Sequence, residues 1–139
     1  MILMAFDPGV TTGVAWLKDG EFGSIELNET NLYMLVDAKC EEIEHGQIEK
    51  FVITQATTKK VVVYDSLYII GYLRYAAWRC GFPIDFTKPA DVMAPFPDVA
   101  LKRAGWHKPG MGHANDAARH LAHHQVRSRA MSASTFLPK

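Results

Sequence analysis

The stretch ILMAFDPGVTTGVAWL, residues 2–17, decides the fold of this chain. Its unbroken apolar run over residues 2–6 is typical of a strand buried on both faces, and that run ends at an acidic residue, Asp7. Pro-Gly and Thr-Thr-Gly then interrupt the chain before a second apolar run at residues 14–17. A Lys-Asp-Gly turn leads to a third predicted strand over residues 21–27, so these strands are expected to form an antiparallel meander.

The rest of the chain predicts helices that alternate with short strands. In chain order, the expected elements are a helix over 28–46, a strand over 47–54, a strand or loop over 57–65, a helix over 66–80 capped by Ser66, a strand over 84–86, a helical turn that begins at Lys88-Pro89, a short helix over 99–104 and an alanine-rich helix over 113–127. Strands reached through helices add in parallel to a sheet. The order therefore predicts an α/β fold with a mixed sheet, antiparallel in front and parallel behind, and helices on both faces.

A length of 139 residues, 48% of them hydrophobic, suits one compact domain. We expect residues 1–127 to form this domain and residues 128–139, which show no periodicity, to form a flexible tail. The apolar run over 67–78 contains an arginine and is too short to span a membrane. With no signal peptide recognised, the sequence predicts a soluble cytoplasmic protein in which Cys40 and Cys80 are reduced, buried thiols.

The formal net charge of +0 combines two opposed halves. Residues 1–58 carry a charge of −7, and residues 59–139 carry +7. Nucleic acid therefore remains a possible partner, because the basic half can contact phosphates. The candidate phosphate contacts are Lys59, Lys60, Lys88, Lys102, Arg103, Lys108, Arg119, Arg127 and Arg129. Trp106 either stacks on an exposed base or anchors a loop.

Three carboxylates fall where the predicted sheet brings them together. Asp7 ends the first strand, Glu49 lies in a strand expected to run parallel beside it, and Asp116 lies in the first turns of the last helix. Taken alone, Asp7 before Pro-Gly also fits a turn, and Glu49 also fits a strand edge or the surface. Three acids this close repel one another unless a cation lies between them, and Mg²⁺ or Mn²⁺ suits oxygen ligands. Two such ions can promote phosphodiester hydrolysis.

A polar stripe on the last predicted helix adds to this pattern. His113, Asp116, His120 and His124 share one helix face because their spacings are three, four and four residues. A solvated surface is one interpretation, and a zinc site built from the three histidines is another, although no cysteine cluster supports it. A third is that His113 joins the acidic site as a ligand or as a proton donor and acceptor.

Four segments together resemble the RuvC-type Holliday junction resolvases, especially the small members carried by bacteriophages. The segments are DPGVTTGVAW (7–16), EKFVIT (49–54), PADVM (89–93) and GHANDAARH (112–120). The resemblance spans residues 2 to about 124. The first segment alone also resembles the phosphate-binding hairpin of the actin and sugar-kinase superfamily, whose enzymes need two such domains where this chain has room for one.

The resemblance implies an RNase H-like fold with a four-membered site for two Mg²⁺ or Mn²⁺ ions. Asp7, Glu49 and Asp116 match the family's acids, and His113 falls where members have aspartate or histidine. The implied activity is endonucleolytic cleavage of branched DNA, four-way junctions or flaps, in recombination and repair, usually by a homodimer. The alternatives are an exonuclease, flap nuclease or RNase H on the same fold, and a junction-binding protein without catalysis.

Overall fold

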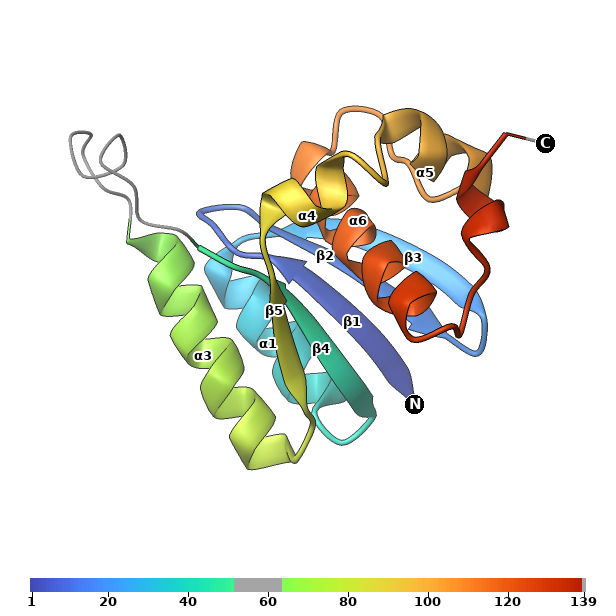
Figure 1. Cartoon of the computed structure of the whole chain (residues 1–139). Helices are drawn as coiled ribbons and strands as arrows, with labels where there is room; N and C mark the ends of the chain where they lie inside the picture. Colours follow the sequence, from blue (N-terminus) through green and yellow to red (C-terminus); the bar gives the residue numbers. More distant parts are fainter. Residues whose placement is uncertain (52–63, 139) are drawn as a thin grey trace.

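A five-stranded mixed sheet separates two layers of helices in the computed structural model, which describes residues 1–51 and 64–138 (Figure 1). The strands are β1 (Ile2–Asp7), β2 (Thr12–Lys18), β3 (Glu21–Leu27), β4 (Ile43–Glu49) and β5 (Ile84–Thr87). Their order in the sheet is β3-β2-β1-β4-β5. The first three form an antiparallel meander, and β4 and β5 add in parallel to β1, as predicted.

The helices cover both faces of the sheet. The regular helices are α1 (Glu29–Lys39), α3 (Asp65–Cys80), α4 (Pro89–Met93), α5 (Asp98–Ala104) and α6 (Gly112–Arg127), and a 3₁₀ helix, η1, spans Ala133–Phe136. α1 and α3 share one face, and α6 lies on the other with α4 and α5 beside it (Figure 1). None of the helices in the described ranges is long and apolar enough to cross a membrane.

Alternation along β1 builds a core on each side of the sheet. Met4 and Phe6 pack toward α1 and α3, whereas Leu3 and Ala5 face α6. The same alternation places Asp7 on the α6 face, where the strand ends. The buried surface of α6 includes four alanines, Ala114, Ala117, Ala118 and Ala122, which let helix and sheet approach closely.

Three expected boundaries differ from the structure. The helix predicted over 28–46 ends at Lys39, because Ile43 is buried in β4 and pairs with Ile2 of β1. The strand predicted over 47–54 accordingly runs from Ile43 to Glu49. Ser66 does not cap α3: its hydroxyl donates instead to the Pro8 carbonyl, 2.9 Å away. Most of the uncertain segment 57–65 lies outside the described residues.

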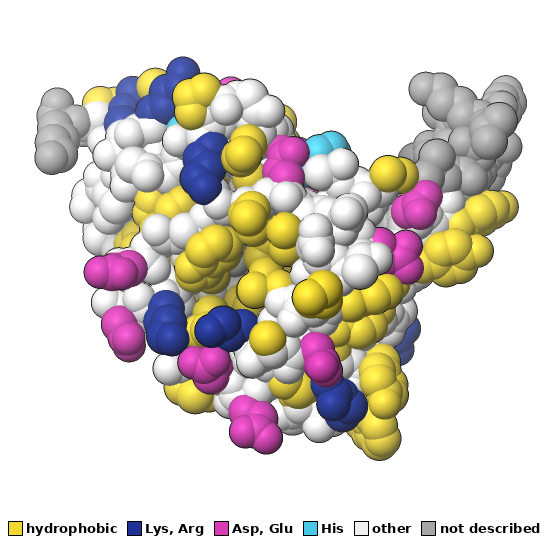
Figure 2. Space-filling view, turned by 180° about the vertical axis from the view of Figure 1, so that it is seen from behind, with side chains coloured by type: hydrophobic (Ala, Val, Ile, Leu, Met, Phe, Trp, Pro, Cys, Tyr) yellow, Lys and Arg dark blue, Asp and Glu magenta, His cyan; other side chains and the backbone are white. Residues whose placement is uncertain are grey.

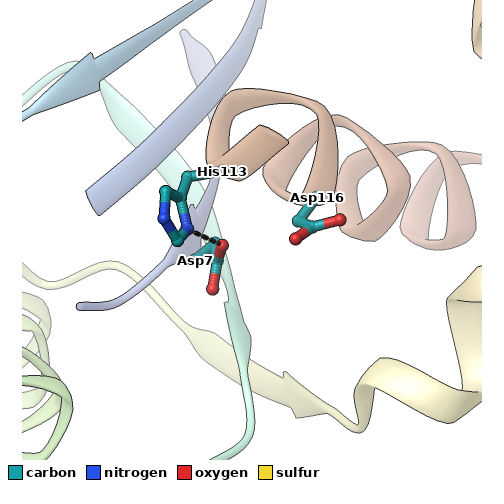
Figure 3. A group of neighbouring side chains, drawn as sticks. All are labelled: Asp7, His113 and Asp116. Carbon is teal, nitrogen blue, oxygen red and sulfur yellow. Dashed lines mark hydrogen bonds and ion pairs between the residues drawn. The ribbon is translucent and has the colours of Figure 1, made fainter. Parts of the chain in front are cut away.

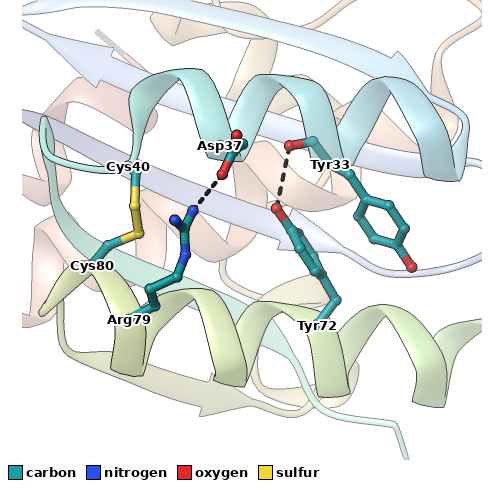
Figure 4. Close-up of a disulfide and its surroundings, with 6 residues drawn as sticks. All are labelled: Tyr33, Asp37, Cys40, Tyr72, Arg79 and Cys80. Carbon is teal, nitrogen blue, oxygen red and sulfur yellow. Dashed lines mark hydrogen bonds and ion pairs between the residues drawn. A yellow bond between two sulfur atoms is a disulfide. The ribbon is translucent and has the colours of Figure 1, made fainter.

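The two cysteines form a disulfide, which corrects the expectation of reduced, buried thiols. The Cys40–Cys80 bridge joins the C-terminal ends of α1 and α3, whose Cα atoms lie 5.4 Å apart there (Figure 4). Beside it, Arg79 pairs with Asp37. Helical periodicity predicts both helices but not that their ends meet, so the pairing carried no sequence signal.

The segment after α6 packs onto the domain, which corrects the expectation of a frayed tail. Phe136 is buried, with its ring edge-on to Phe96 and Trp106. Trp106 is itself buried and stacks on Phe22, with ring centroids 4.5 Å apart. The loop-anchor interpretation of Trp106 is therefore correct, and its stacking on an exposed base is wrong.

Candidate active site

Asp7 and Glu49 are the last residues of two neighbouring parallel strands. The β1–β4 register aligns Phe6 with Ile48, so the two carboxyl groups emerge side by side at one edge of the sheet. Asp7 is buried, and its carboxyl group lies beside that of Glu49, which is partly exposed. This is the juxtaposition that the sequence predicted for the two acids.

The N-terminal turns of α6 bring His113 and Asp116 to the same point (Figure 3). His113 Nδ1 lies 2.9 Å from Asp7 Oδ2. One potential ligand atom from each of Asp7, His113 and Asp116 lies within 4.8 Å of the other two. These three predicted site residues therefore form one group, and Glu49 adjoins it through its neighbour Asp7.

Two features of the meander fix the position of this helix end. Gly13, paired with Asp7 across β1 and β2, has no side chain, and a Cβ there would overlap the His113 carbonyl. Glu26 of β3 accepts hydrogen bonds from the backbone N–H groups of His113 and Ala114, at 3.1 and 3.4 Å. Because Met111 provides no cap, Glu26 caps α6 from a distant strand.

The acids are electrostatically strained without a cation. Burial, followed by the hydrogen bond and charge of Glu49, raises the pKa of Asp7 to about 10. Burial and the Glu49 charge also raise the pKa of Asp116, although Arg119 opposes them. Burial alone would raise the pKa of Glu49, but hydrogen bonds with His120 and Asp7 outweigh it and lower that pKa. The three carboxylates fit Mg²⁺ or Mn²⁺, either of which would offset this repulsion, and the imidazole of His113 is a nitrogen donor beside them.

His120 is a site residue whose role the sequence did not reveal. Its ring is fully buried, and Nε2 lies 3.1 Å from Glu49 Oε1. The predicted polar stripe is therefore divided, because His113 contacts Asp7 and His124 stacks on His45. A zinc site through His113, His120 and His124 is wrong for this arrangement. The four-residue spacing from Asp116 was the available signal for His120.

Arg119 is placed differently from the phosphate contact expected of it. The residue is buried, its Nε donates to the Phe96 carbonyl at 2.8 Å, and its NH1 donates to Asp116 at 2.7 Å. NH2 pairs with Asp98 of α5. Arg119 therefore holds the Asp116 carboxylate in place, and its three-residue spacing from Asp116 is the sequence signal for that role.

Solved structures share this architecture. RuvC from T. thermophilus in complex with Holliday junction substrate matches with a TM-score of 0.68 and 16% sequence identity, over 94% of this chain and 96% of that chain. A second T. thermophilus RuvC structure matches with a TM-score of 0.64 and 17% identity over the same shares. This chain has the RuvC fold.

More distant similarity extends beyond RuvC. YeaZ from Pseudomonas aeruginosa matches with a TM-score of 0.51 and 14% identity, over 76% of this chain and 52% of that chain. No family model matches the sequence, and a search of curated proteins finds no significant match. The RuvC fold is thus shown by three-dimensional similarity, at 16% and 17% sequence identity.

The basic residues predicted to contact phosphate are distributed unevenly over this RuvC fold. Lys108 donates to the Ser24 carbonyl and Arg103 to the Phe136 carbonyl. Lys88, Lys102 and Arg127 are exposed, and within residues 1–51 and 64–138 they make no ion pair. Lys59 and Lys60 lie outside the described residues.

Proposed function

We propose that this protein is a divalent-metal-dependent endonuclease that cleaves branched DNA, such as four-way junctions and flaps. One observation carries the proposal: Asp7, Glu49, His113 and Asp116 converge at the carboxyl ends of β1 and β4. The RuvC fold supports the substrate class, since T. thermophilus RuvC is described in complex with Holliday junction substrate.

We assign Asp7, Glu49, Asp116 and the imidazole of His113 as the groups that would hold two Mg²⁺ or Mn²⁺ ions. Bound ions of this kind activate water and stabilise the negative charge of a phosphodiester undergoing hydrolysis. Burial keeps Asp7 protonated in the chain alone, so it must release its proton to become a ligand. Apparent metal affinity should therefore rise with pH.

Other residues orient these ligands. His120 holds one oxygen of Glu49, and Arg119 holds one oxygen of Asp116. Such fixed orientation reduces the reorganisation needed during the reaction. His120 and Arg119 are positioning residues in this proposal.

We also propose that the protein acts as a homodimer that meets through α3. The outward face of α3 exposes Tyr68, Tyr75 and Trp78, and Tyr64, the residue just before the helix, is exposed four residues before Tyr68. Trp78 is 78% exposed. Figure 2 shows hydrophobic side chains along the edge formed by this helix. A two-fold dimer presents two equivalent sites, which matches the two-fold symmetry of a four-way junction.

Light scattering tests the dimer. Tyr68→Ser combined with Trp78→Ser should convert a wild-type dimer to a monomer, whereas Met34→Ser, an equally exposed apolar position on α1, should leave the mass unchanged. A monomeric wild-type protein at cleavage-competent concentrations would contradict this assignment.

A substrate panel tests the function. The protein is incubated in Mg²⁺ and in Mn²⁺ with labelled four-way junction, flap, linear duplex and RNA–DNA hybrid. We expect cleavage at internal positions of the junction or flap. Digestion from duplex ends would instead indicate an exonuclease, cleavage of the hybrid alone an RNase H, and junction binding without any cleavage a non-catalytic protein.

A further inference from the structure

The sheet surface under the C-terminal half of α6 is unusually polar. At every second position β4 presents His45, Gln47 and Glu49 to this face. The neighbouring edge strand β5 adds Asp85 and Thr87 to the same face. The proposed function uses only Glu49 from this polar row.

Hydrogen bonds join the row into one network. His45 Nε2 lies 3.1 Å from Gln47 Oε1, and Gln47 Nε2 donates to Thr87 Oγ1. The His124 ring of α6 stacks on His45, with centroids 4.0 Å apart. Burying polar groups costs free energy even when they are paired, and an apolar row would pack here at least as well. A polar row kept at this cost indicates that this surface binds a polar ligand.

A groove of about 530 Å³ lies over this row, between β5 and α4 on one side and α6 on the other. Gln47 and Thr87 line it together with His124, and Lys50, Lys88 and Arg127 contribute cationic side chains. Lys50 and Lys88 also line an adjoining hollow of about 430 Å³ that contains Glu49. The groove therefore adjoins the candidate active site at these two lysines.

The charges of the groove favour an extended anion. Lys50, Lys88 and Arg127 are exposed and make no ion pair with any residue the structure describes. Two acids also line the groove, Asp85 and Asp91, and Asp85 lies 3.7 Å from His45. Lysine, arginine and neutral hydrogen-bonding side chains are the usual contacts of nucleic-acid phosphates.

We propose that this groove binds the phosphodiester backbone of the DNA strand that continues from the cleaved phosphate. Lys50 and Lys88 contact the phosphates nearest the active site, and Arg127 contacts one farther along the strand. The proposal rests on the proposed function, since a nucleic-acid substrate is what places a phosphodiester chain at Glu49. It adds a strand path that is distinct from the metal ligands.

The test measures binding of a four-way junction by fluorescence anisotropy at several salt concentrations, in an Asp7→Asn background that prevents cleavage. Lys50→Gln, Lys88→Gln and Arg127→Gln are combined in one protein. The salt slope, which is the dependence of log affinity on log salt concentration, changes by about 0.7 for each single-strand phosphate contact. Loss of three contacts should therefore lower the magnitude of this slope by about two and the affinity by at least tenfold. Lys39→Gln, on α1 across the sheet, is the matched control and should stay within twofold.

Neutral methylphosphonates, placed singly on either side of the cleavage position, map the path. We expect substitutions on one side to weaken binding by the protein with an intact groove and to have no effect on the triple variant. A triple variant that binds with the affinity and salt slope of the Lys39→Gln protein would overturn the proposal that this groove binds the DNA strand. Failure of the proposed function is distinguishable, because the wild type would then bind the junction through this groove without cutting it.

Discussion

The carbonyl of His113 lies against the backbone of Gly13, where a Cβ would overlap it. Gly13 is also the residue paired with Asp7 across the β1–β2 ladder. This glycine therefore sets how closely α6 approaches the sheet, and with it the distances from His113 and Asp116 to Asp7. A residue without chemistry of its own controls the geometry of the candidate site.

Gly13→Ala should push α6 away from the sheet. We expect the free energy of unfolding to fall by about 1–3 kcal/mol, and cleavage to fall about 100-fold because a displacement near 1 Å misaligns the ligands. Thermal denaturation and the junction assay measure the two effects. Gly112→Ala, one residue before His113 and in open space, should keep both within error of wild type. Normal activity in Gly13→Ala would contradict the role given to this contact.

Asp7→Asn should change the pH dependence of stability in the metal-free protein. The pKa of Asp7 is raised from 3.8 to about 10, so the folded chain holds this proton more tightly than the unfolded chain. The stabilisation is fully present below pH about 4 and is lost as pH rises toward 10. Urea unfolding in EDTA should show the wild type losing stability relative to Asp7→Asn between these limits. Parallel profiles for the two proteins would show that the pKa of Asp7 is normal.

Divalent cation should stabilise the wild type and not the Asp7→Asn protein. A ligand that binds only the folded state at 100 times its dissociation constant adds about 2.7 kcal/mol. We expect Mn²⁺ to raise the melting temperature of wild type in proportion to the logarithm of its concentration. Equal shifts in both proteins would place the Mn²⁺ site elsewhere.

Arg119→Lys should destabilise the fold and weaken the metal site together. Lysine keeps the charge but cannot bridge Asp98, Asp116 and the Phe96 carbonyl at once. Breaking this buried network should cost about 3 kcal/mol and lower Mn²⁺ affinity, measured by calorimetry, because Asp116 loses its restraint. Arg103→Lys, with one hydrogen bond to the Phe136 carbonyl, should cost under about 1 kcal/mol. Similar losses of stability in Arg119→Lys and Arg103→Lys would contradict the role of Arg119 in holding Asp116.

Reduction of the Cys40–Cys80 disulfide should lower stability with little effect on cleavage. The bridge closes a loop of sequence separation 40, for which chain entropy gives about 4 kcal/mol. It lies at the far end of α3 from Ser66, the residue that contacts Pro8 beside the site. Chemical denaturation of the Cys40→Ser, Cys80→Ser protein checks the first effect. A large loss of cleavage by this protein under native conditions would show that the bridge also shapes the site.

The sequence predicted the sheet and the meeting of Asp7 with Glu49 because both depend on local patterns and simple topology. The apolar run before Asp7 marks a central strand, and a parallel neighbour necessarily brings Glu49 to the same edge. The exact end of the first helix was not predictable, since Ile43 suits a helix face as well as a buried strand. Only its pairing with Ile2 of β1 shows that Ile43 belongs to the strand β4.

Features that depend on which surfaces meet were missed. The three-residue spacing allows Arg119 to pair with Asp116, but the burial of Arg119 depends on Asp98 and the Phe96 carbonyl, which only the packed structure places opposite it. Likewise, Cys40 and Cys80 become neighbours only when α1 and α3 pack side by side, and Phe136 becomes buried only when Trp106 provides a surface for it.

The most direct test of the central claim is the single-turnover rate of four-way junction cleavage in Mg²⁺, for the wild type and for Asp7→Asn at saturating protein. If the acidic cluster is the active site, the wild type should cut the junction internally, and EDTA should abolish these cuts. The cleavage rate of Asp7→Asn should be at least 1000-fold lower, which corresponds to a rise of about 4 kcal/mol in activation free energy. Cleavage by Asp7→Asn at the wild-type rate would contradict the claim.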